Sequence, residues 1–250
     1  MAHLYPLPTN YKLVFFHNVC SFTVWFCCFG RFLVLLPLVG RKFLPGGIAD
    51  FFHIVSVLPF IGFLLVKSCI GVGFSKYDLW ALFNSIKMIW ICYGVIFPHP
   101  KIAKHTSYSF LISSWCIMYM IHYSYYAFRI KTKSSPKFLF WLNFHHHYFT
   151  FPVAIISEMI LVFLSLGFAE ENSWVEIGLK FTMLAYIPIG YFQWEYLNGQ
   201  RLIRYNDLKK KIESSSTRND DGTPPRNTSL SPLQNQEDIQ LRTIPSNSRS

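Results

Sequence analysis

The sequence predicts an all-α membrane protein whose six transmembrane helices form one bundle, with both termini in the cytosol. The chain of 250 residues is 52% hydrophobic and only 14% charged, whereas soluble globular proteins average about 25% charged residues. Its apolar residues gather in six segments, at about residues 12–39, 48–73, 78–98, 107–129, 138–167 and 175–198. Each segment is near or above the length of about 20 residues that a helix needs to cross a bilayer.

Basic residues between the segments predict the orientation. The connections after the second and fourth segments, and the stretch after the sixth, carry Lys76, Arg129, Lys131, Lys133, Lys137, Arg201 and Arg204. The other connections carry Arg41, Lys42, Lys101 and Lys104, and then the acidic Glu170, Glu171 and Glu176. Because Lys and Arg concentrate in cytosolic loops, and an even number of spans places both ends on one side, we expect both termini in the cytosol.

The net charge of +10 is spread over these connections. It therefore indicates membrane topology and not a nucleic-acid partner, which would need a continuous basic face. Three basic residues nevertheless lie inside predicted spans, namely Arg31, Lys67 and Lys87. Their side chains either extend to the membrane interface or pair with an acidic residue, and the sequence leaves both explanations open. The acidic residues considered for such pairing are Asp50, Asp78 and Glu158.

The composition changes at about Asn206, where a segment begins that is rich in Ser, Pro, Asn and Asp and poor in aromatic residues. Such a segment buries too little apolar surface to offset its chain entropy. We therefore predict two parts, with residues 1–204 forming the six-helix transmembrane domain and residues 205–250 forming a disordered cytosolic tail.

The fifth segment contains the main candidate for a functional site. Glu158 lies in almost unbroken apolar sequence, and a carboxylate at membrane depth is costly unless it faces the bundle interior or a wet cavity. At about 100° per residue, His147, Phe151 and Glu158 would lie within about 20° of one another on an ideal helix. Tyr148 lies about one turn before Phe151. Pro152 removes one backbone hydrogen bond and can kink the helix between these residues.

Three consecutive histidines, His145, His146 and His147, suggest a metal site. Adjacent helical residues point about 100° apart, however, so the three cannot bind one ion together. A two-ligand site that includes His122 stays open, and so does an interfacial or wet-cavity position without metal. We expect neither a metal nor a cofactor. The sequence contains no glycine-rich phosphate loop, nucleophile elbow or zinc-protease motif, which argues against a kinase, hydrolase or protease.

Four stretches together resemble the very-long-chain 3-hydroxyacyl-CoA dehydratase family. In the first and fourth segments, the residues similar to family patterns are Tyr11, Asn18, Trp25, Trp115 and Tyr123. FPVAIISE at residues 151–158 is similar to the family's Tyr-Pro-x-Gly-x-x-Ser-Glu, and LAYIPIGYF at residues 184–192 extends the likeness. The second and third segments match poorly. In the fourth segment, the family's Glu and Arg positions hold Tyr119 and His122.

The resemblance implies a hydro-lyase of the endoplasmic reticulum membrane. Such an enzyme removes water from a long-chain 3-hydroxyacyl-CoA to give a trans-2-enoyl-CoA in fatty-acid elongation, in contact with membrane lipid and other elongation enzymes. Its catalytic pair would be Glu158 and a tyrosine, but the tyrosine position holds Phe151. Because Phe cannot donate a proton, we expect an activity lowered by about 10²–10⁴-fold unless Tyr148 or His147 takes that role.

Two other functions stay open at this point. One is a non-catalytic membrane protein of the endoplasmic reticulum that binds acyl chains or partners in the elongation complex. The other is a small transporter that uses Glu158 and His147 as a proton relay, although the sequence lacks the internal repeats typical of transporters.

Overall fold

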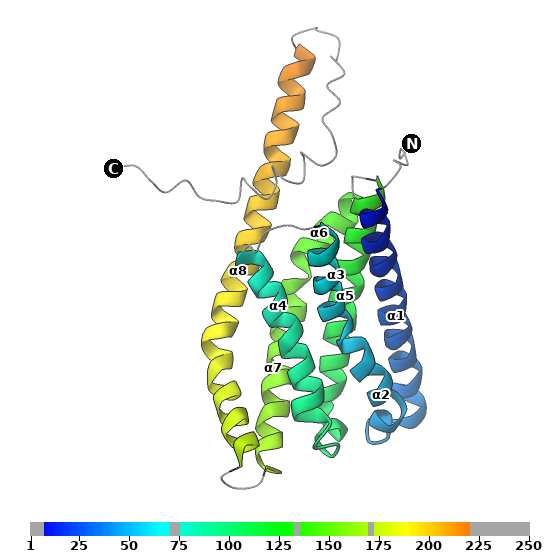
Figure 1. Cartoon of the computed structure of the whole chain (residues 1–250), viewed down its shortest axis with the longest axis vertical. Coiled ribbons are helices and arrows are strands. Elements are labelled where there is room, and N and C mark those ends of the chain that lie inside the picture. Colours follow the sequence, from blue (N-terminus) through cyan, green and yellow to red (C-terminus); the bar gives the residue numbers. More distant parts are fainter. Residues whose placement is uncertain (1–7, 71–75, 133–135, 170–172, 221–250) are drawn as a thin grey trace, which may run out of the picture. The chain divides into compact units, whose positions relative to one another are not determined.

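The computed structural model describes residues 8–70, 76–132, 136–169 and 173–220, without side-chain detail for residues 70, 76, 77 and 211–220. All regular structure in these ranges is helical, which confirms the all-α prediction (Figure 1). The chain divides into two compact units, Met1–Arg201 and Leu202–Ser250. The helical bundle and the candidate site described below belong to the first unit.

The helices follow one another along the chain with short connections. Their bounds are α1 (Thr9–Val39), α2 (Leu44–Ser56), α3 (Leu58–Ile70), α4 (Lys76–Ile89), the π-helix η1 (Trp90–Ile96), the 3₁₀-helix η2 (Ile102–Lys104), α5 (Thr106–Thr132), α6 (Lys137–His145), α7 (His147–Leu166) and α8 (Trp174–Asp220).

Four helical stretches are long and apolar enough to cross a membrane: Thr9–Val39, Leu44–Cys69, Asp78–Ile96 and Lys137–Leu166. They correspond to the first, second, third and fifth predicted segments. The fourth and sixth predicted segments are also helical, within α5 and α8. The chain is therefore a multi-pass membrane protein, built on at least these four stretches.

Two of the predicted spans are each divided between two α-helices. The second segment divides at Val57, between α2 and α3, where Pro59 lacks a backbone N–H and so weakens the helical hydrogen bonding. The fifth segment divides at His146, between α6 and α7. Pro152 lies inside α7, which continues through it. The helix is therefore interrupted at His146, before Phe151, and continues unbroken through the proline.

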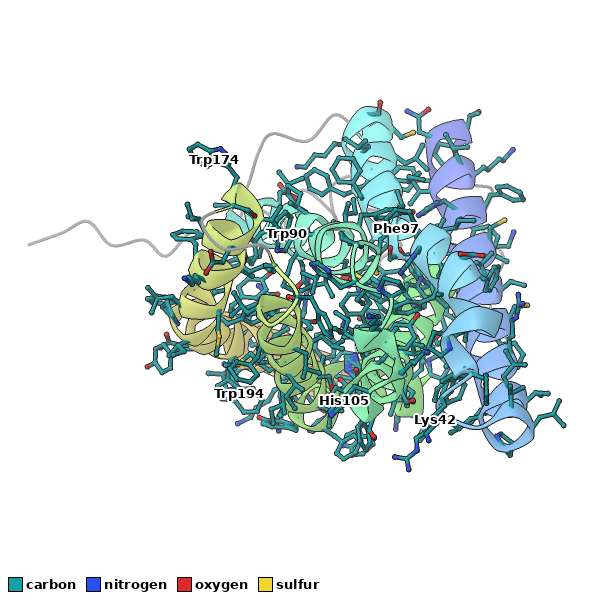
Figure 2. All side chains as sticks on the ribbon, turned by 90° about the horizontal axis from the view of Figure 1, so that it is seen from below. Lys42, Trp90, Phe97, His105, Trp174 and Trp194 are labelled. Carbon is teal, nitrogen blue, oxygen red and sulfur yellow. The ribbon has the colours of Figure 1, made fainter. Side chains whose placement is uncertain are left out.

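The core of the bundle lies around α5, which contacts both α1 and α7. Aromatic side chains fill this region: Trp25 stacks on Tyr119 with ring centroids 5.0 Å apart, and Phe52 stacks on Trp115 at 5.6 Å. Side chains also fill the space between the other helices, where Trp90 of η1 extends toward α8 (Figure 2). This packing fixes the faces of α5 and α7 that carry the candidate site.

The last helix extends beyond the boundary expected from composition. The sequence predicts a disordered tail from about Asn206, whereas α8 continues to Asp220. Residues 206–213 include Leu, Lys and Glu, which have high helix propensity, and this local preference favours a helix even where no core is buried. Residues 221–250 lie outside the described part of the chain.

Candidate functional site

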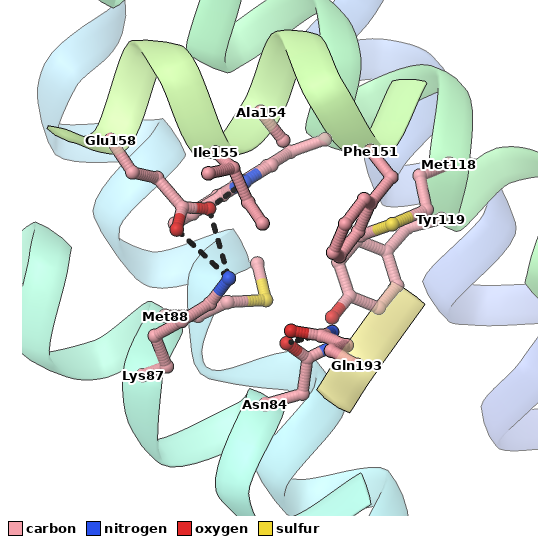
Figure 3. Close-up of a pocket in the computed structure, with 11 residues that line it drawn as sticks. Asn84, Lys87, Met88, Met118, Tyr119, Phe151, Ala154, Ile155, Glu158 and Gln193 are labelled. Atoms are coloured by element: carbon pink, nitrogen blue, oxygen red, sulfur yellow. Dashed lines mark hydrogen bonds and ion pairs between the residues drawn. The ribbon is translucent and has the colours of Figure 1, made fainter. Parts of the chain in front are cut away.

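A small cavity lies between α4, α5, α7 and α8 (Figure 3). Its volume is about 20 Å³ of space open to the centre of a water molecule, which is room for about one water. The side chains that line it are Asn84, Lys87, Met88, Trp115, Met118, Tyr119, Phe151, Ala154, Ile155, Glu158 and Gln193. Polar and apolar groups therefore meet in the interior of the bundle.

Glu158 of α7 is fully buried, and three other helices supply donors to its carboxylate. The Lys87 ammonium of α4 lies 2.8 Å from Oε2 and 3.2 Å from Oε1. Trp115 of α5 donates its indole N–H to Oε1 at 3.0 Å, and Tyr186 of α8 donates its hydroxyl to Oε2 at 2.7 Å. Both oxygens are thus hydrogen-bonded, which a buried carboxylate requires. We call these four residues the Glu158 cluster.

Two of the three basic residues inside the predicted spans pair with acidic residues. Lys87 pairs with Glu158, and Lys67 of α3 pairs with Asp78 of α4 at 2.5 Å. Arg31 differs, because its side chain is exposed and its guanidinium lies 6.0 Å from the centre of the Phe51 ring. Pairing, one of the two explanations left open by the sequence, is therefore correct for the two lysines.

Phe151 lies on the same cavity as Glu158, as their shared helical face predicts. Its ring is buried and packs against Trp194 of α8, with centroids 5.8 Å apart. Tyr119 of α5 also lines the cavity, and Figure 3 shows its hydroxyl directed toward Gln193. Gln193 in turn donates to the side-chain oxygen of Asn84 at 3.1 Å. The position implied for a catalytic tyrosine therefore holds an apolar ring, and a tyrosine approaches from another helix.

The structure does not place His147 or Tyr148 on this cavity. His147 is buried, but its Nε2 lies 3.3 Å from the side-chain oxygen of Asn198 on α8. Tyr148 is exposed and donates its hydroxyl to the same Asn198 oxygen at 2.9 Å, while Arg201 donates to the Tyr148 hydroxyl. The two residues considered as replacements for the catalytic tyrosine thus belong to a separate polar cluster with Asn198 and Arg201.

The consecutive histidines are spread over different surroundings. His145 packs on Trp141 with ring centroids 4.9 Å apart, and neither ring nitrogen of His146 has a hydrogen-bond partner. Within the described residues, no group of three or more His, Cys, Asp or Glu side chains is placed to hold a metal ion. Within the described residues, these histidines therefore take part in packing and hydrogen bonding, and the two-ligand site with His122 stays a hypothesis.

Sequence reasoning did not assign several residues of the site. Trp115 and Tyr186 were part of the family resemblance, yet their contact with Glu158 was not expected. Asn84 and Gln193 were not considered. The sequence did indicate that each of these residues would need a hydrogen-bond partner, because each places a polar group inside an apolar span. The partner itself could not be identified, since nothing local specifies how α4, α5 and α8 rotate toward α7.

The fold and the site define a multi-pass helical membrane protein with a buried carboxylate that contacts donors on three other helices. A family profile described as "Protein tyrosine phosphatase-like protein, PTPLA" matches residues 70–206, which is more than half of the chain. The chain belongs to this family. The matched region contains all four members of the Glu158 cluster.

The chain is similar to several known proteins at low identity. It is 21% identical over 127 residues to the very-long-chain (3R)-3-hydroxyacyl-CoA dehydratase PASTICCINO 2 of Arabidopsis thaliana, and 26% identical over 130 residues to a probable dehydratase of the same kind from Schizosaccharomyces pombe. It is 24% identical over 191 residues to the beta-1,6-glucan synthesis-associated protein KEG1 of Saccharomyces cerevisiae. No solved structure matches the chain.

These similarities differ in how much of each protein they cover. The matches span 45% of this chain and 58% of PASTICCINO 2, and 51% of this chain and 62% of the Schizosaccharomyces protein. The match to KEG1 spans 73% of this chain and 93% of KEG1. The likeness to the two named dehydratases is therefore partial, whereas the likeness to KEG1 extends over nearly the whole of that protein.

Proposed function

We propose that this chain is a non-catalytic member of the dehydratase-like family that acts in association with β-1,6-glucan synthesis. The observation that carries the proposal is Phe151 on the cavity beside Glu158. Removal of water from a 3-hydroxyacyl thioester needs one group to accept a proton and another to donate one, each within about 3 Å of its atom. A phenylalanine ring can do neither.

The surroundings of Glu158 support the same conclusion. Its two oxygens accept hydrogen bonds from Lys87, Trp115 and Tyr186. The adjoining cavity has room for about one water. A carboxylate in this position is well suited to join helices and poorly placed to exchange protons with a long-chain thioester.

The comparison with KEG1 supports the biological context. The chain matches that protein over 93% of its length, although at only 24% identity. We therefore assign this chain, as a proposal, to the same kind of role that the name of KEG1 states. In this role, its interior would serve fold stability, while its partners would be membrane lipid and other proteins of the same membrane.

We further propose the membrane arrangement that goes with this role. Six spans would lie in the endoplasmic reticulum membrane with both termini in the cytosol, because α5 and the first unit's part of α8 are each long enough to join the four apolar stretches. Residues 1–204 would form the membrane domain, and residues 205–250 would form a cytosolic extension that the domain does not need.

The experiment combines an enzymatic and a cellular measurement. The purified protein is incubated with a long-chain 3-hydroxyacyl-CoA, with PASTICCINO 2 as the positive control, and enoyl-CoA is quantified. In parallel, the chain is expressed in yeast whose KEG1 gene is switched off, and wall β-1,6-glucan is measured. We expect no enoyl-CoA and a restored glucan content. Enoyl-CoA formation without any recovery of glucan would contradict the proposal.

A second candidate function is the dehydratase activity itself, with long-chain 3-hydroxyacyl-CoA as substrate and other elongation enzymes as partners. One observation favours it: the Tyr119 hydroxyl is directed into the cavity that Glu158 also lines (Figure 3). Tyr119 is better placed for this than Tyr148 or His147, which lie outside the cavity lining. If this function holds, enoyl-CoA formation is lost in both Tyr119→Phe and Glu158→Ala.

A further inference from the structure

The stretch that carries Lys87 is the least apolar of the four candidate spans. Its mean hydropathy is 1.5, compared with 2.0 to 2.1 for the other three. It runs from Asp78 to Ile96, and Lys87 is its central residue. A lysine costs most at the centre of a transmembrane helix, at about 3 kcal/mol on insertion scales.

Lys87 cannot avoid this cost by reaching the membrane surface. Each end of the stretch is nine residues away, or about 13 Å at the rise of an α-helix, which is farther than a lysine side chain extends. Its side chain is only 13% exposed, and its ammonium contacts Glu158 instead. The charge is therefore compensated inside the bundle and by a residue of another helix.

That compensating residue comes much later in the chain. Glu158 follows Lys87 by 71 residues in the sequence, and α5 and α6 lie between them along the chain. Until α7 has joined the bundle, the described residues of the earlier helices offer Lys87 no acidic partner, since Asp78 pairs with Lys67 and Asp50 lies on α2 away from the cavity lining. The stability of α4 in the bilayer thus depends on a helix that follows it.

We propose that α4 is a conditional transmembrane segment, which Lys87 destabilises in the bilayer until Glu158 of α7 neutralises it. The charge pair then couples the retention of α4 to the completion of the bundle. Tyr186 supports the completed arrangement from α8, because its hydroxyl binds the carboxylate and its ring lies 5.9 Å from the Lys87 ammonium. This inference goes beyond the proposed role in glucan synthesis and does not depend on that role, but its test rests on the membrane orientation proposed above.

The test uses the full chain with a flexible insert that carries an N-glycosylation sequon between Pro100 and Lys101. This connection reaches the lumen when α4 spans the membrane, so the glycosylated fraction in microsomes measures retention of α4. Glu158→Gln keeps hydrogen-bonding groups for Trp115 and Tyr186 but removes the charge. We expect it to lower the glycosylated fraction about fivefold or more.

The double variant Lys87→Met/Glu158→Gln restores the glycosylated fraction to the level of the wild type. Lys87→Met alone leaves it unchanged, because α4 is then apolar, but lowers the melting temperature in detergent by about 10 °C, since Glu158 is left without its cation. A role in packing alone would affect the two single variants equally. A glycosylated fraction that falls in Glu158→Gln but not in Lys87→Met is therefore specific to a conditional span.

Lys180 of α8 provides the matched control, because its side chain is 66% exposed and Lys180→Met also removes a lysine from an ion pair, here with Glu176. We expect no change in either measurement, since an ion pair whose lysine is exposed to solvent contributes little. The proposal is overturned if Glu158→Gln is glycosylated like the wild type, or if the double variant is not rescued. It is also overturned if the unmodified chain with the insert stays unglycosylated, because α4 would then not bring this connection to the lumen.

Discussion

Tyr119 of α5 and Phe151 of α7 line one cavity from two different helices. Glu158, about two turns beyond Phe151 on α7, completes the polar end of the same cavity. The phenolic hydroxyl available there comes from a helix other than the one that the FPVAIISE pattern indicates. The geometry of a dehydratase that uses a tyrosine and a glutamate two turns apart on one helix is therefore absent from this interior.

Replacing Phe151 by tyrosine tests whether that geometry can be recovered. We expect Phe151→Tyr to form no more enoyl-CoA from a long-chain 3-hydroxyacyl-CoA than the wild type, because Lys87 still pairs with Glu158 and a cavity with room for only about one water gains no space for a thioester. The measurement is product quantification by mass spectrometry. A gain of about 10²-fold that Glu158→Ala abolishes would instead show an impaired enzyme.

Gly62 of α3 allows a close approach to α1. A Cβ atom built on Gly62 would lie 2.5 Å from His17 Nε2, so a side chain there forces His17 to move. We expect Gly62→Ala to cost about 1–3 kcal/mol, seen as a melting temperature in detergent that is lower by about 5 °C.

The steric origin of this effect can be separated from helix propensity. Gly30→Ala is the matched control, because a Cβ atom there meets nothing within 4 Å, and it should leave the melting temperature unchanged or slightly higher. Combining Gly62→Ala with His17→Ala should recover most of the loss. Equal melting temperatures for Gly62→Ala and the wild type would argue against close packing of α1 and α3.

Truncation tests the proposed boundary of the membrane domain. A chain that ends before Ser214 lacks the last turns of α8 and residues 221–250, which follow the described part of α8. We expect its yield and detergent melting temperature to equal those of the full chain, because the first unit ends at Arg201. A large drop in either quantity would show that the removed segment contributes to the fold.

The orientation of the termini is tested by a glycosylation reporter fused after Ser250. With six spans and both ends in the cytosol, the reporter should stay unmodified in microsomes. The positive control carries the same reporter in the connection between α7 and α8, which this orientation places in the lumen. Modification of the C-terminal reporter would require an odd number of spans or the opposite orientation.

The helical architecture was largely predictable because it depends on composition and segment length. The described residues of all six predicted segments are mainly helical, and four of the segments contain a stretch long and apolar enough for a membrane span. The division at Val57 was not predicted, although Pro59 indicated it. The continuation of α8 beyond Asn206 was missed because composition measures core burial, whereas local helix propensity also acts on exposed residues.

The candidate site was predictable only along α7. Burial of Glu158 followed from the cost of a charge in the membrane, and its shared face with Phe151 followed from helical periodicity. His147 and Tyr148 were expected near Glu158, but their side chains bind Asn198 of α8. Tertiary partners of this kind depend on how separate helices rotate against one another, and periodicity within one helix carries no information on that rotation.

The π-helix η1 has a consequence for natural variation in chain length. Phe97 donates its backbone N–H to the carbonyl of Cys92, five residues earlier, at 2.9 Å. A hydrogen bond of this kind spans one more residue than the bond between residues i and i+4 of an α-helix. A single-residue deletion within Trp90–Ile96 could therefore be absorbed by conversion to regular α-helix. The same deletion between Lys87 and Trp90 would rotate Lys87 relative to all that follows, so we expect orthologues to differ in length within η1 and not before it.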